Sequence, residues 1–335
     1  MAYTTINKHT DYFNTKLYNG TGSSNAITGV GFQPDFTWIK RRNGATNHHL
    51  HNAVSGATKV LYSNSNPTEA TNAQMLSSFD SDGFTVGTNG DANNSSGTFA
   101  SWNWKANGAG SSNSDGSVTS TVSANTTAGF SIAKYTGTGS NLTFGHGLGA
   151  IPDWFMIKNL SVGQAWRVYH RDMTLSDPYS KRMVISETGT ETSSALGLSQ
   201  DPTSSLIYID TSTGCTNASG ENFICYAWTE KPGYSKFGTY TGNGSNNGTF
   251  VYTGFKPAWL MIKRTDSSDI WAMYDNKRIG QNPNNYLVEA NTNAAEYASD
   301  RLDLLSNGFK PRYDWTPINA DGGTYIYMAF GQSLV

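Results

Sequence analysis

The chain has 335 residues, a formal net charge of −2 and no basic run longer than Lys40-Arg41-Arg42, which excludes the basic surface that nucleic-acid binding requires. No apolar run approaches the about 20 residues of a membrane-spanning helix, and Met1–Ile6 lacks the basic and apolar regions of a signal peptide. We therefore expect a protein made in a cytoplasm, with no nucleic-acid partner and no membrane span.

The composition indicates the fold class. Only 14% of the residues are charged, whereas soluble chains average about 25%, and Gly, Ser, Thr and Asn are abundant. Short strands joined by tight turns use these residues, but surface helices need Glu, Lys, Arg and Ala. The composition therefore predicts an all-β fold with helix as a minor component.

Residues 1–12 are a polar segment without periodicity, which we interpret as a lead-in to the first folded unit, residues 13–105. In this unit Thr37–Lys40 and Thr58–Tyr62 are predicted strands, because β-branched and aromatic residues stand there between turn signals.

The first unit also contains the densest group of metal-ligand side chains, His48, His49 and His51. On a strand His49 and His51 share one face, which is a workable pair for zinc or copper. No Cys, Asp or Glu stands within ten residues to complete a site. In the two later units, the positions that align with His48 and His51 are Trp and Tyr. We therefore predict no metal and no other cofactor, with His49 and His51 as weak candidates.

Residues 106–127 are almost free of large apolar side chains and rich in Gly and Ser, which predicts a flexible linker. The second unit, residues 128–232, has its clearest predicted strands at Leu206–Ile209 and Phe223–Trp228. Its two cysteines, Cys215 and Cys225, flank a turn and could face each other across a hairpin. Manufacture in a cytoplasm favours two reduced thiols.

The third unit, residues 233–335, ends in a predicted strand at Tyr325–Phe330. A short helix is predicted at Asn293–Ala298, and the matching segment Pro67–Ala73 of the first unit supports a helical turn there.

One ten-residue pattern occurs three times, at Gly31–Lys40, Gly149–Lys158 and Gly254–Lys263. In each copy a proline follows the glycine by three residues and a lysine follows the proline by six. A Tyr-x-Gly-x-Gly-Ser motif precedes each copy, and an aromatic alternation closes each unit. The chain therefore repeats one unit of roughly a hundred residues. We predict three tandem antiparallel β-sandwiches, jelly-roll or concanavalin-like.

Aromatic residues divide into two groups. Trp38, Trp154 and Trp259 lie in the repeated pattern, and we expect them to fill the cores of the three units. Other aromatic residues lie outside the repeat columns, beside Asn, Ser and Asp, whose hydrogen bonds complement the apolar face of a ring at interfaces and sugar sites. The candidates for such an interface or ligand site are Tyr179, Tyr313 and Trp315.

Catalytic motifs are missing from the sequence: it has no nucleophile elbow, no zinc-protease motif and no phosphate-binding loop. Glycoside hydrolysis needs two carboxylates that face one cleft. Candidates are present, but no pair of them recurs; they are Asp153, Asp172, Glu187, Asp266 and Glu296. We therefore expect a protein without catalytic residues and without enzymatic activity.

Three segments, Ser235–Ser245, Gly254–Pro257 and Asn319–Phe330, resemble an uncharacterised repeat of virion structural proteins from tailed bacteriophages, many of them marine. Such proteins are often labelled tail fibre or appendage, and Asp11–Gly20 resembles their opening residues. The resemblance covers nearly the whole chain and carries over no catalytic or ligand residue. It implies a component of a phage particle.

The leading hypothesis is therefore a non-enzymatic virion protein of a tail fibre or surface appendage. We expect it to form a homo-oligomer, with a trimer favoured in a fibre, and to contact other virion proteins and host surface glycans. One alternative is a capsid decoration protein that bridges capsomers. A second alternative is a polysaccharide depolymerase.

Overall fold

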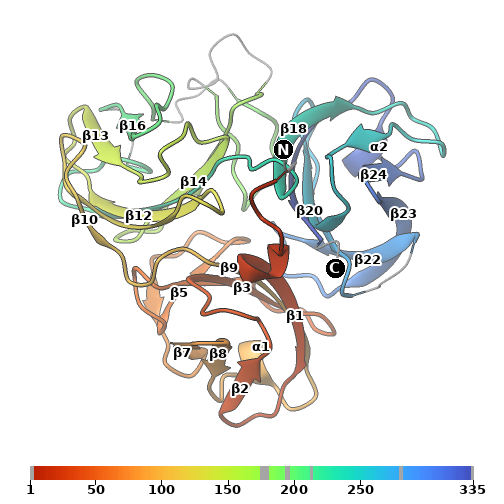
Figure 1. The fold of residues 1–335 in the computed structure, drawn as a ribbon, viewed down its shortest axis with the longest axis horizontal. Coiled ribbons are helices and arrows are strands. Elements are labelled where there is room, and N and C mark those ends of the chain that lie inside the picture. The colour runs from red at the N-terminus through yellow and green to blue at the C-terminus, as the bar shows by residue number, and fades with distance from the viewer. Residues whose placement is uncertain (1–3, 174–180, 193–196, 212–213, 279–281, 333–335) are drawn as a thin grey trace.

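The computed structural model describes residues 4–173, 181–192, 197–211, 214–278 and 282–332, and it confirms an all-β chain. Three lobes follow one another along the chain and meet at the centre of the molecule (Figure 1). We refer to residues 13–104 as lobe 1, residues 111–228 as lobe 2 and residues 235–331 as lobe 3. Within the described part of the chain, no helix is long and apolar enough to cross a membrane.

Lobe 1 contains a six-stranded sheet in the order β1-β9-β3-β4-β5-β6 and a three-stranded sheet in the order β2-β8-β7. A short 3₁₀ helix, η1 (His9–Asp11), precedes the lobe, and α1 (Gly90–Asn93) precedes its last strand. The strands are β1 (Phe13–Asn19), β2 (Asn25–Thr28), β3 (Phe36–Arg41), β4 (His49–Asn52), β5 (Lys59–Tyr62), β6 (Ala70–Thr71), β7 (Leu76–Asp80), β8 (Gly83–Val86) and β9 (Thr98–Trp104).

Lobe 2 contains a six-stranded sheet in the order β10-β11-β12-β17-β14-β15 and the pair β13-β16. Its strands are β10 (Ser111–Asn113), β11 (Ser120–Asn125), β12 (Phe130–Thr136), β13 (Leu142–Gly145), β14 (Trp154–Asn159), β15 (Arg167–His170), β16 (Leu206–Ile209) and β17 (Asn222–Trp228). Two of these strands lie within residues 106–127, so the segment expected to be a flexible linker instead extends a sheet.

Lobe 3 contains one eight-stranded sheet in the order β18-β25-β20-β21-β22-β23-β24-β19, and its last strands form the outer layer of the lobe. The short helix α2 (Thr316–Asn319) precedes the final strand. The strands are β18 (Ser235–Thr241), β19 (Val251–Tyr252), β20 (Pro257–Arg264), β21 (Trp271–Asp275), β22 (Asn284–Glu289), β23 (Tyr297–Leu305), β24 (Gly308–Pro311) and β25 (Thr324–Gly331).

The three lobes share one four-stranded antiparallel ladder. In each lobe the closing strand lies between the first long strand and the strand of the proline pattern, and the next strand along the chain completes the ladder. The orders are β1-β9-β3-β4, β12-β17-β14-β15 and β18-β25-β20-β21. Equivalent positions have equivalent partners, because Trp38 faces Trp102, Met156 faces Tyr226 and Met261 faces Met328. The repeat that the sequence shows is therefore a repeat of strand order and of register.

One face of each ladder packs within its own lobe, because side chains alternate between the two faces of a strand. In lobe 1 Ile39 packs with Phe84 of the second sheet, and in lobe 2 Ile157 packs with Phe144. In lobe 3 Leu260 packs with Leu302 of the outer layer. Each lobe is therefore a sandwich-like pair of layers with its own core.

The other faces of the three ladders meet in a shared core at the centre of the molecule. A void of only about 10 Å³ remains there, lined by Phe36, Trp38, Trp104, Trp154, Met156, Trp228, Trp259, Met261 and Met328, three residues from each lobe. Trp38, Trp154 and Trp259 were expected to fill the cores of the separate units. They fill the core between the lobes instead.

Each Tyr-x-Gly-x-Gly-Ser motif forms the same turn, held by a buried asparagine that the sequence did not single out. In lobe 3 Asn319 Oδ1 accepts from the Asn243 backbone N–H, and Asn319 Nδ2 donates to Ser245 O. The Tyr240 hydroxyl donates to Ile318 O at 2.7 Å. Asn93 with Tyr18 and Asn217 with Tyr135 make the corresponding bonds in lobes 1 and 2. The glycine motifs are turns, as expected.

The first glycine of this turn has no room for a side chain, since a Cβ at Gly242 would lie 2.3 Å from the Ala320 backbone oxygen. Gly242→Ala is therefore expected to lower the free energy of unfolding by about 1–3 kcal/mol, measured by denaturant titration. Gly189→Ala is the matched control, because nothing lies within 4 Å of a Cβ there. If Gly242→Ala and Gly189→Ala changed the free energy of unfolding equally, the close approach of Gly242 to the Ala320 backbone would not be what limits this position.

Two local predictions are wrong. Residues 293–296 form no regular element and Tyr297 begins β23, so the predicted helix at Asn293–Ala298 is not present. The matching segment Pro67–Ala73 contains β6 instead of a helical turn.

Both cysteines are buried and free, which confirms the prediction of reduced thiols. Burial of the Cys225 thiol raises its pKa, so it stays protonated at neutral pH.

Candidate interaction surfaces

The histidines of the first repeat are buried in lobe 1. Trp38 Nε1 donates to His48 Nδ1 at 2.8 Å, and His51 Nδ1 donates to Lys59 O at 2.8 Å. His49 packs edge-on against Tyr62, with 5.6 Å between the ring centroids. Burial lowers the pKa of His49 to about 3 and that of His51 to about 4, so both rings are neutral at pH 7.

His49 and His51 share one face of β4, as expected, but the structure brings no third ligand to them. In the described ranges, no group of three His, Cys, Asp or Glu side chains is placed to hold a metal ion. Structural zinc sites use four ligands, and catalytic ones use three. The two histidines therefore act as packing and hydrogen-bonding groups of the lobe 1 core.

The lysine of the repeated pattern joins the lobes to one another. Lys40, Lys158 and Lys263 are buried, and each donates from Nζ to a backbone oxygen six residues further along its own lobe. Each also donates to a backbone oxygen of a different lobe: Lys40 to Asn293 of lobe 3, Lys158 to Asn66 of lobe 1 and Lys263 to Thr188 of lobe 2. The three contacts therefore close a cycle around the molecule.

Burial lowers the pKa of each of these lysines to about 8, because the ammonium group loses its hydration. The lysines are still mostly charged at pH 7, and backbone carbonyl oxygens are the acceptors that stabilise the charge. An electrostatic role between lobes accounts for a lysine inside an otherwise apolar strand. The repeated lysine was visible in the sequence, but the lobe that it contacts was not.

The residue eight positions after each lysine continues the same cycle. Trp166 Nε1 donates to Tyr62 O of lobe 1 at 2.8 Å, and Trp271 Nε1 donates to Val184 O of lobe 2 at 3.1 Å. The residue at this position in lobe 1 is His48. Burial lowers the pKa of His48, and a backbone hydrogen bond to Glu289 of lobe 3 partly opposes this shift. Histidine thus replaces tryptophan as a polar group at the same lobe contact.

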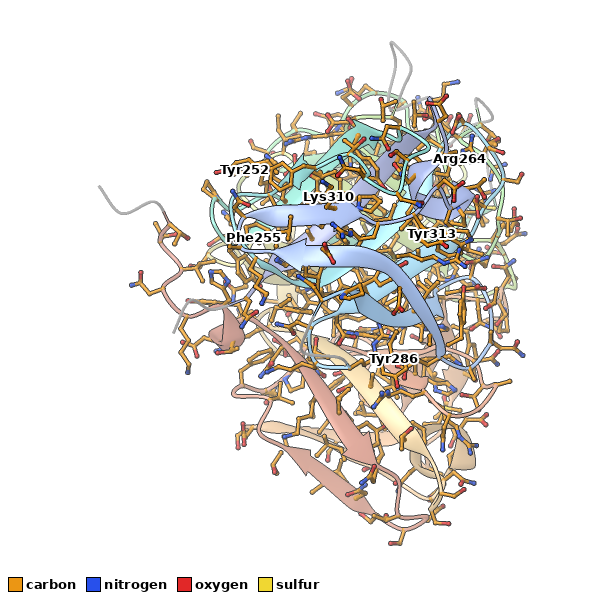
Figure 2. The ribbon with its side chains drawn as sticks, turned by 90° about the vertical axis from the view of Figure 1, so that its right-hand side faces the viewer. Tyr252, Phe255, Arg264, Tyr286, Lys310 and Tyr313 are labelled. Carbon is orange, nitrogen blue, oxygen red and sulfur yellow. The ribbon has the colours of Figure 1, made fainter. Side chains whose placement is uncertain are left out.

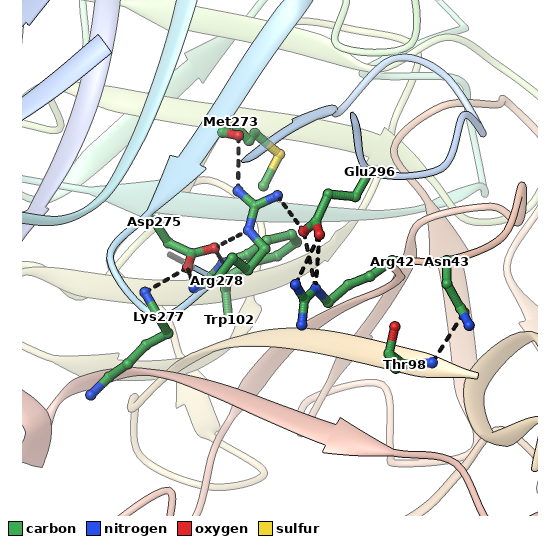
Figure 3. A network of polar contacts seen from close by, with 9 residues as sticks. All are labelled: Arg42, Asn43, Thr98, Trp102, Met273, Asp275, Lys277, Arg278 and Glu296. Carbon is green, nitrogen blue, oxygen red and sulfur yellow. Dashed lines mark hydrogen bonds and ion pairs between the residues drawn. The ribbon is translucent and has the colours of Figure 1, made fainter. Parts of the chain in front are cut away.

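A buried charged network adds to the contact between lobes 1 and 3 (Figure 3). Glu296 accepts from Arg42 at 2.9 Å and from Arg278 at 3.2 Å. Arg278 Nε also donates to Asp275 Oδ2 at 2.6 Å, and Trp102 Nε1 of lobe 1 donates to the same oxygen at 3.0 Å. The Arg278 and Asp275 side chains are fully buried, so removal of either partner would leave an uncompensated charge.

The sequence-predicted aromatic candidates have different positions. Tyr179 lies outside the described residues. Tyr313 is 51% exposed, whereas Trp315 is half-buried against the lobe 3 core, with the Arg301 guanidinium 4.1 Å from its ring centroid. Trp315 is therefore partly covered by a cation–π contact, and Tyr313 is the more accessible of the two.

The outer face of lobe 3 carries further exposed rings that the sequence did not single out. Phe250 is 46% exposed and Tyr252 is 57% exposed, and they stand at alternate positions around β19. Tyr252 is paired with Gly308, which has no side chain to cover it. Figure 2 shows Tyr252, Lys310 and Tyr313 on this face of the lobe. We call Phe250, Tyr252 and Tyr313 the aromatic face of lobe 3.

Cationic side chains accompany the aromatic face. Lys310 donates to Asn247 Oδ1 at 2.5 Å, and Arg312 forms an ion pair with Asp303 at 3.4 Å. These pairs lie at the surface, where such contacts are weak and readily exchanged. Aromatic rings next to cations and amides can bind a sugar ring and its polar or acidic groups.

The chain belongs to the family described as a domain of unknown function, DUF7483, which matches residues 8–333. The family thus spans all three lobes. No curated protein matches the chain.

Proposed function

We propose that this chain is a non-enzymatic structural protein of a tailed-phage virion, in a tail fibre or surface appendage. The observation that carries the proposal is the cycle of Lys40, Lys158 and Lys263, each of which holds two lobes together. The shared core joins the same three lobes, so the chain is one body built from repeats. A rigid body of this kind suits a particle component, which is what the resemblance to phage proteins implies.

The contacts of the carboxylates support a role without catalysis. Asp153 accepts from the Arg171 guanidinium and the Glu230 backbone N–H, and Asp266 accepts from Arg264 at 2.9 Å. Glu296 belongs to the buried network between lobes 1 and 3. A glycosidase would need a pair of acids facing a cleft. The depolymerase alternative is tested by measuring reducing ends after incubation with host surface polysaccharide, and their release would overturn the non-enzymatic proposal.

Location on the particle tests the structural proposal most directly. Immunogold labelling of intact virions should place the protein on a tail fibre or another surface appendage. Labelling of the capsid would favour a decoration protein that bridges capsomers.

We also infer a homo-oligomer, with a trimer in a fibre, and lobes of the jelly-roll or concanavalin-like kind. Light scattering on the purified chain tests the oligomer, and a trimer mass is expected.

Recognition of host surface glycan is a second proposed function, favoured by the aromatic face of lobe 3. Tyr252→Ala or Tyr313→Ala should weaken adsorption to host glycan about fivefold to tenfold, which corresponds to about 1 kcal/mol of lost ring contact. The measurement is binding of the purified protein to a glycan array or to host cells.

Ile151→Ala is the matched control for this experiment. Ile151 is 56% exposed but belongs to lobe 2, so its substitution should leave glycan binding unchanged. If both tyrosine variants bound glycan as well as the wild type, the aromatic face would not be the glycan site. The proposed location of the protein on the particle would be unaffected.

A further inference from the structure

The first strand of the ladder has two edges, and the lobes treat the second edge differently. One edge of β1, β12 and β18 pairs with the closing strand of the same lobe. In lobe 2 the other edge pairs with β11, in a register from Thr121 opposite Lys134 to Asn125 opposite Phe130. In the sheets of lobes 1 and 3, β1 and β18 are the terminal strands.

Strands β1 and β12 can be aligned residue by residue. Tyr18 and Tyr135 make the same hydroxyl hydrogen bond, to Ala92 O at 2.8 Å and to Thr216 O at 2.7 Å. Counting back from these tyrosines, residues 13–17 of β1 correspond to residues 130–134 of β12. Residues 130–134 are the ones that pair with β11.

Two adjoining cavities lie along this part of β1. The first, of about 150 Å³, is lined by Phe13, Asn14 and Thr15 together with Lys277 and other residues of lobe 3. The second, of about 320 Å³, is lined by residues 14–17, Gly29 and Lys277. Together they cover residues 13–17, so lobe 1 has an open groove at the position where lobe 2 has a strand. We call it the β1 groove.

The backbone of β1 is oriented for strand pairing in this groove. Tyr12 O accepts from Lys105 N, Asn14 O accepts from the Asn103 side chain, and Gly20 N donates to Gly97 O. Even-numbered residues thus direct their backbone groups to β9. Because these groups alternate along a strand, Phe13, Thr15 and Leu17 direct theirs to the groove.

The corresponding edge of β18 is covered differently. The Arg171 side chain of lobe 2 donates to Phe237 O at 3.5 Å, at the position equivalent to Thr15. An edge strand with open backbone groups accepts an added strand. The edge of β1 therefore combines backbone groups that have no strand partner with two adjoining cavities.

The groove also has a charge. Lys16 and Lys277 line its larger cavity, and no acidic side chain is among the described residues that line it. Asp82, which accepts from the backbone N–H of Gly29 beside the cavity, offsets part of the charge of Lys16. Lys16 stands where lobe 2 has Ala133, which pairs with Val122 of β11. A strand that occupies the β1 groove thus meets a cation where β11 meets a methyl group.

We propose that the β1 groove binds an extended peptide strand of another protein molecule by antiparallel strand addition, and that this strand carries an acidic side chain opposite Lys16. The backbone of Thr15 and Leu17 supplies the hydrogen bonds, and Lys16 with Lys277 supplies the selectivity for acid. This interaction goes beyond the proposed virion role, since it concerns a defined edge of one lobe.

The test uses the full chain and two synthetic ten-residue peptides. The first has the sequence of residues 118–127, which contains β11, and the second has glutamate in place of Val122. The glutamate peptide should bind about tenfold more tightly at low salt, and the difference should shrink as salt screens the charge. Amide exchange by NMR should slow at Thr15 and Leu17 when the peptide binds.

Thr15→Pro removes a backbone N–H that faces the groove while leaving the ladder with β9 intact, so it should abolish binding. Thr15→Val is the matched control, because the buried Thr15 hydroxyl has no hydrogen-bond partner among the described residues. Lys16→Gln changes no backbone group, and it should remove the preference for the glutamate peptide. Loss of binding in Thr15→Pro alone, with the preference lost in Lys16→Gln, supports the proposal.

Two results would overturn it. One is absence of binding by either peptide to the folded wild-type chain at millimolar concentration. The other is binding that Thr15→Pro and Lys16→Gln leave unchanged, because the peptide would then occupy a different surface.

Discussion

Trp259→Ala is expected to lower the free energy of unfolding by about 3–5 kcal/mol, as large-to-small substitutions of buried aromatic residues do. Trp259 is fully buried in the shared core, where its ring lies 5.6 Å from that of Trp104 in lobe 1 and 6.0 Å from that of Phe330. Removal of the ring therefore leaves a cavity between lobes. Side chains of other lobes border this cavity, so a rearrangement within lobe 3 cannot fill it. Denaturant titration of the variant and the wild type measures the loss.

Two further variants define what the measurement means. Trp259→Phe keeps an aromatic ring, and Trp259 Nε1 has no hydrogen-bond partner among the described residues. This variant should therefore lose less than half of the stability that Trp259→Ala loses. Tyr252→Ala removes an exposed ring of the same lobe and should change stability by less than about 0.5 kcal/mol. A loss below about 1 kcal/mol for Trp259→Ala would mean that the shared core contributes little.

Acidification should unfold the protein between about pH 6 and pH 4.5, above the pKa values of most carboxylates. All six histidines of the chain have a lowered pKa, and burial is the first cause in each case. The pKa is about 3 for His49 and His170 and about 4 for His51 and His146. These four rings are neutral in the folded chain at pH 5.

The sign of the effect follows from proton linkage. Below pH 6.5 the unfolded chain binds protons at these histidines, whereas the folded chain does not, so falling pH favours unfolding. Each histidine contributes at most about 1.4 kcal/mol per pH unit, and the contribution is complete above the unfolded pKa of about 6.5. Between pH 6.5 and pH 4.5 the four histidines with a pKa of about 3 or 4 can together remove on the order of 10 kcal/mol, which is comparable to the about 5–15 kcal/mol that stabilises a typical domain.

Fluorescence-monitored unfolding at a series of pH values measures this dependence. His49→Phe is the specific control, because the ring packs on Tyr62 and neither nitrogen of His49 has a hydrogen-bond partner among the described residues. This variant should reduce the slope by up to about 1.4 kcal/mol per pH unit. Constant stability from pH 7 to pH 5 would show that the histidines bind protons in the folded chain as readily as in the unfolded chain.

The strands of the ladder were predictable because local patterns define them. The proline pattern leads directly into β3, β14 and β20, and aromatic alternation marks the closing strands. The strand β11 was missed because Ser120–Asn125 contains only Val122 and Ala124 as apolar residues, which local composition cannot distinguish from a linker. Its pairing with β12 is a tertiary effect that overrides composition.

The contacts between lobes could not be predicted from the sequence. Lys40 and Asn293 are joined across 253 residues, and Arg42 and Glu296 across 254. The alanine-rich segment around Glu296 has helical propensity, but its glutamate is fixed by two arginines and residues 293–296 form no regular element. The solvent exposure of single aromatic side chains could not be predicted either, since Tyr313 and Trp315 have similar neighbours in sequence and different burial.

The shared core sets the number of repeats that the chain can contain. Each lobe leaves one full face of its ladder to be covered by the other two, and three lobes complete that coverage. Deletion of one copy would expose apolar surface on both survivors, and a fourth copy would find no ladder face left to cover its own. Gain or loss of a single unit should therefore destabilise this chain, in contrast to arrays in which each repeat contacts only its neighbours and can be added singly.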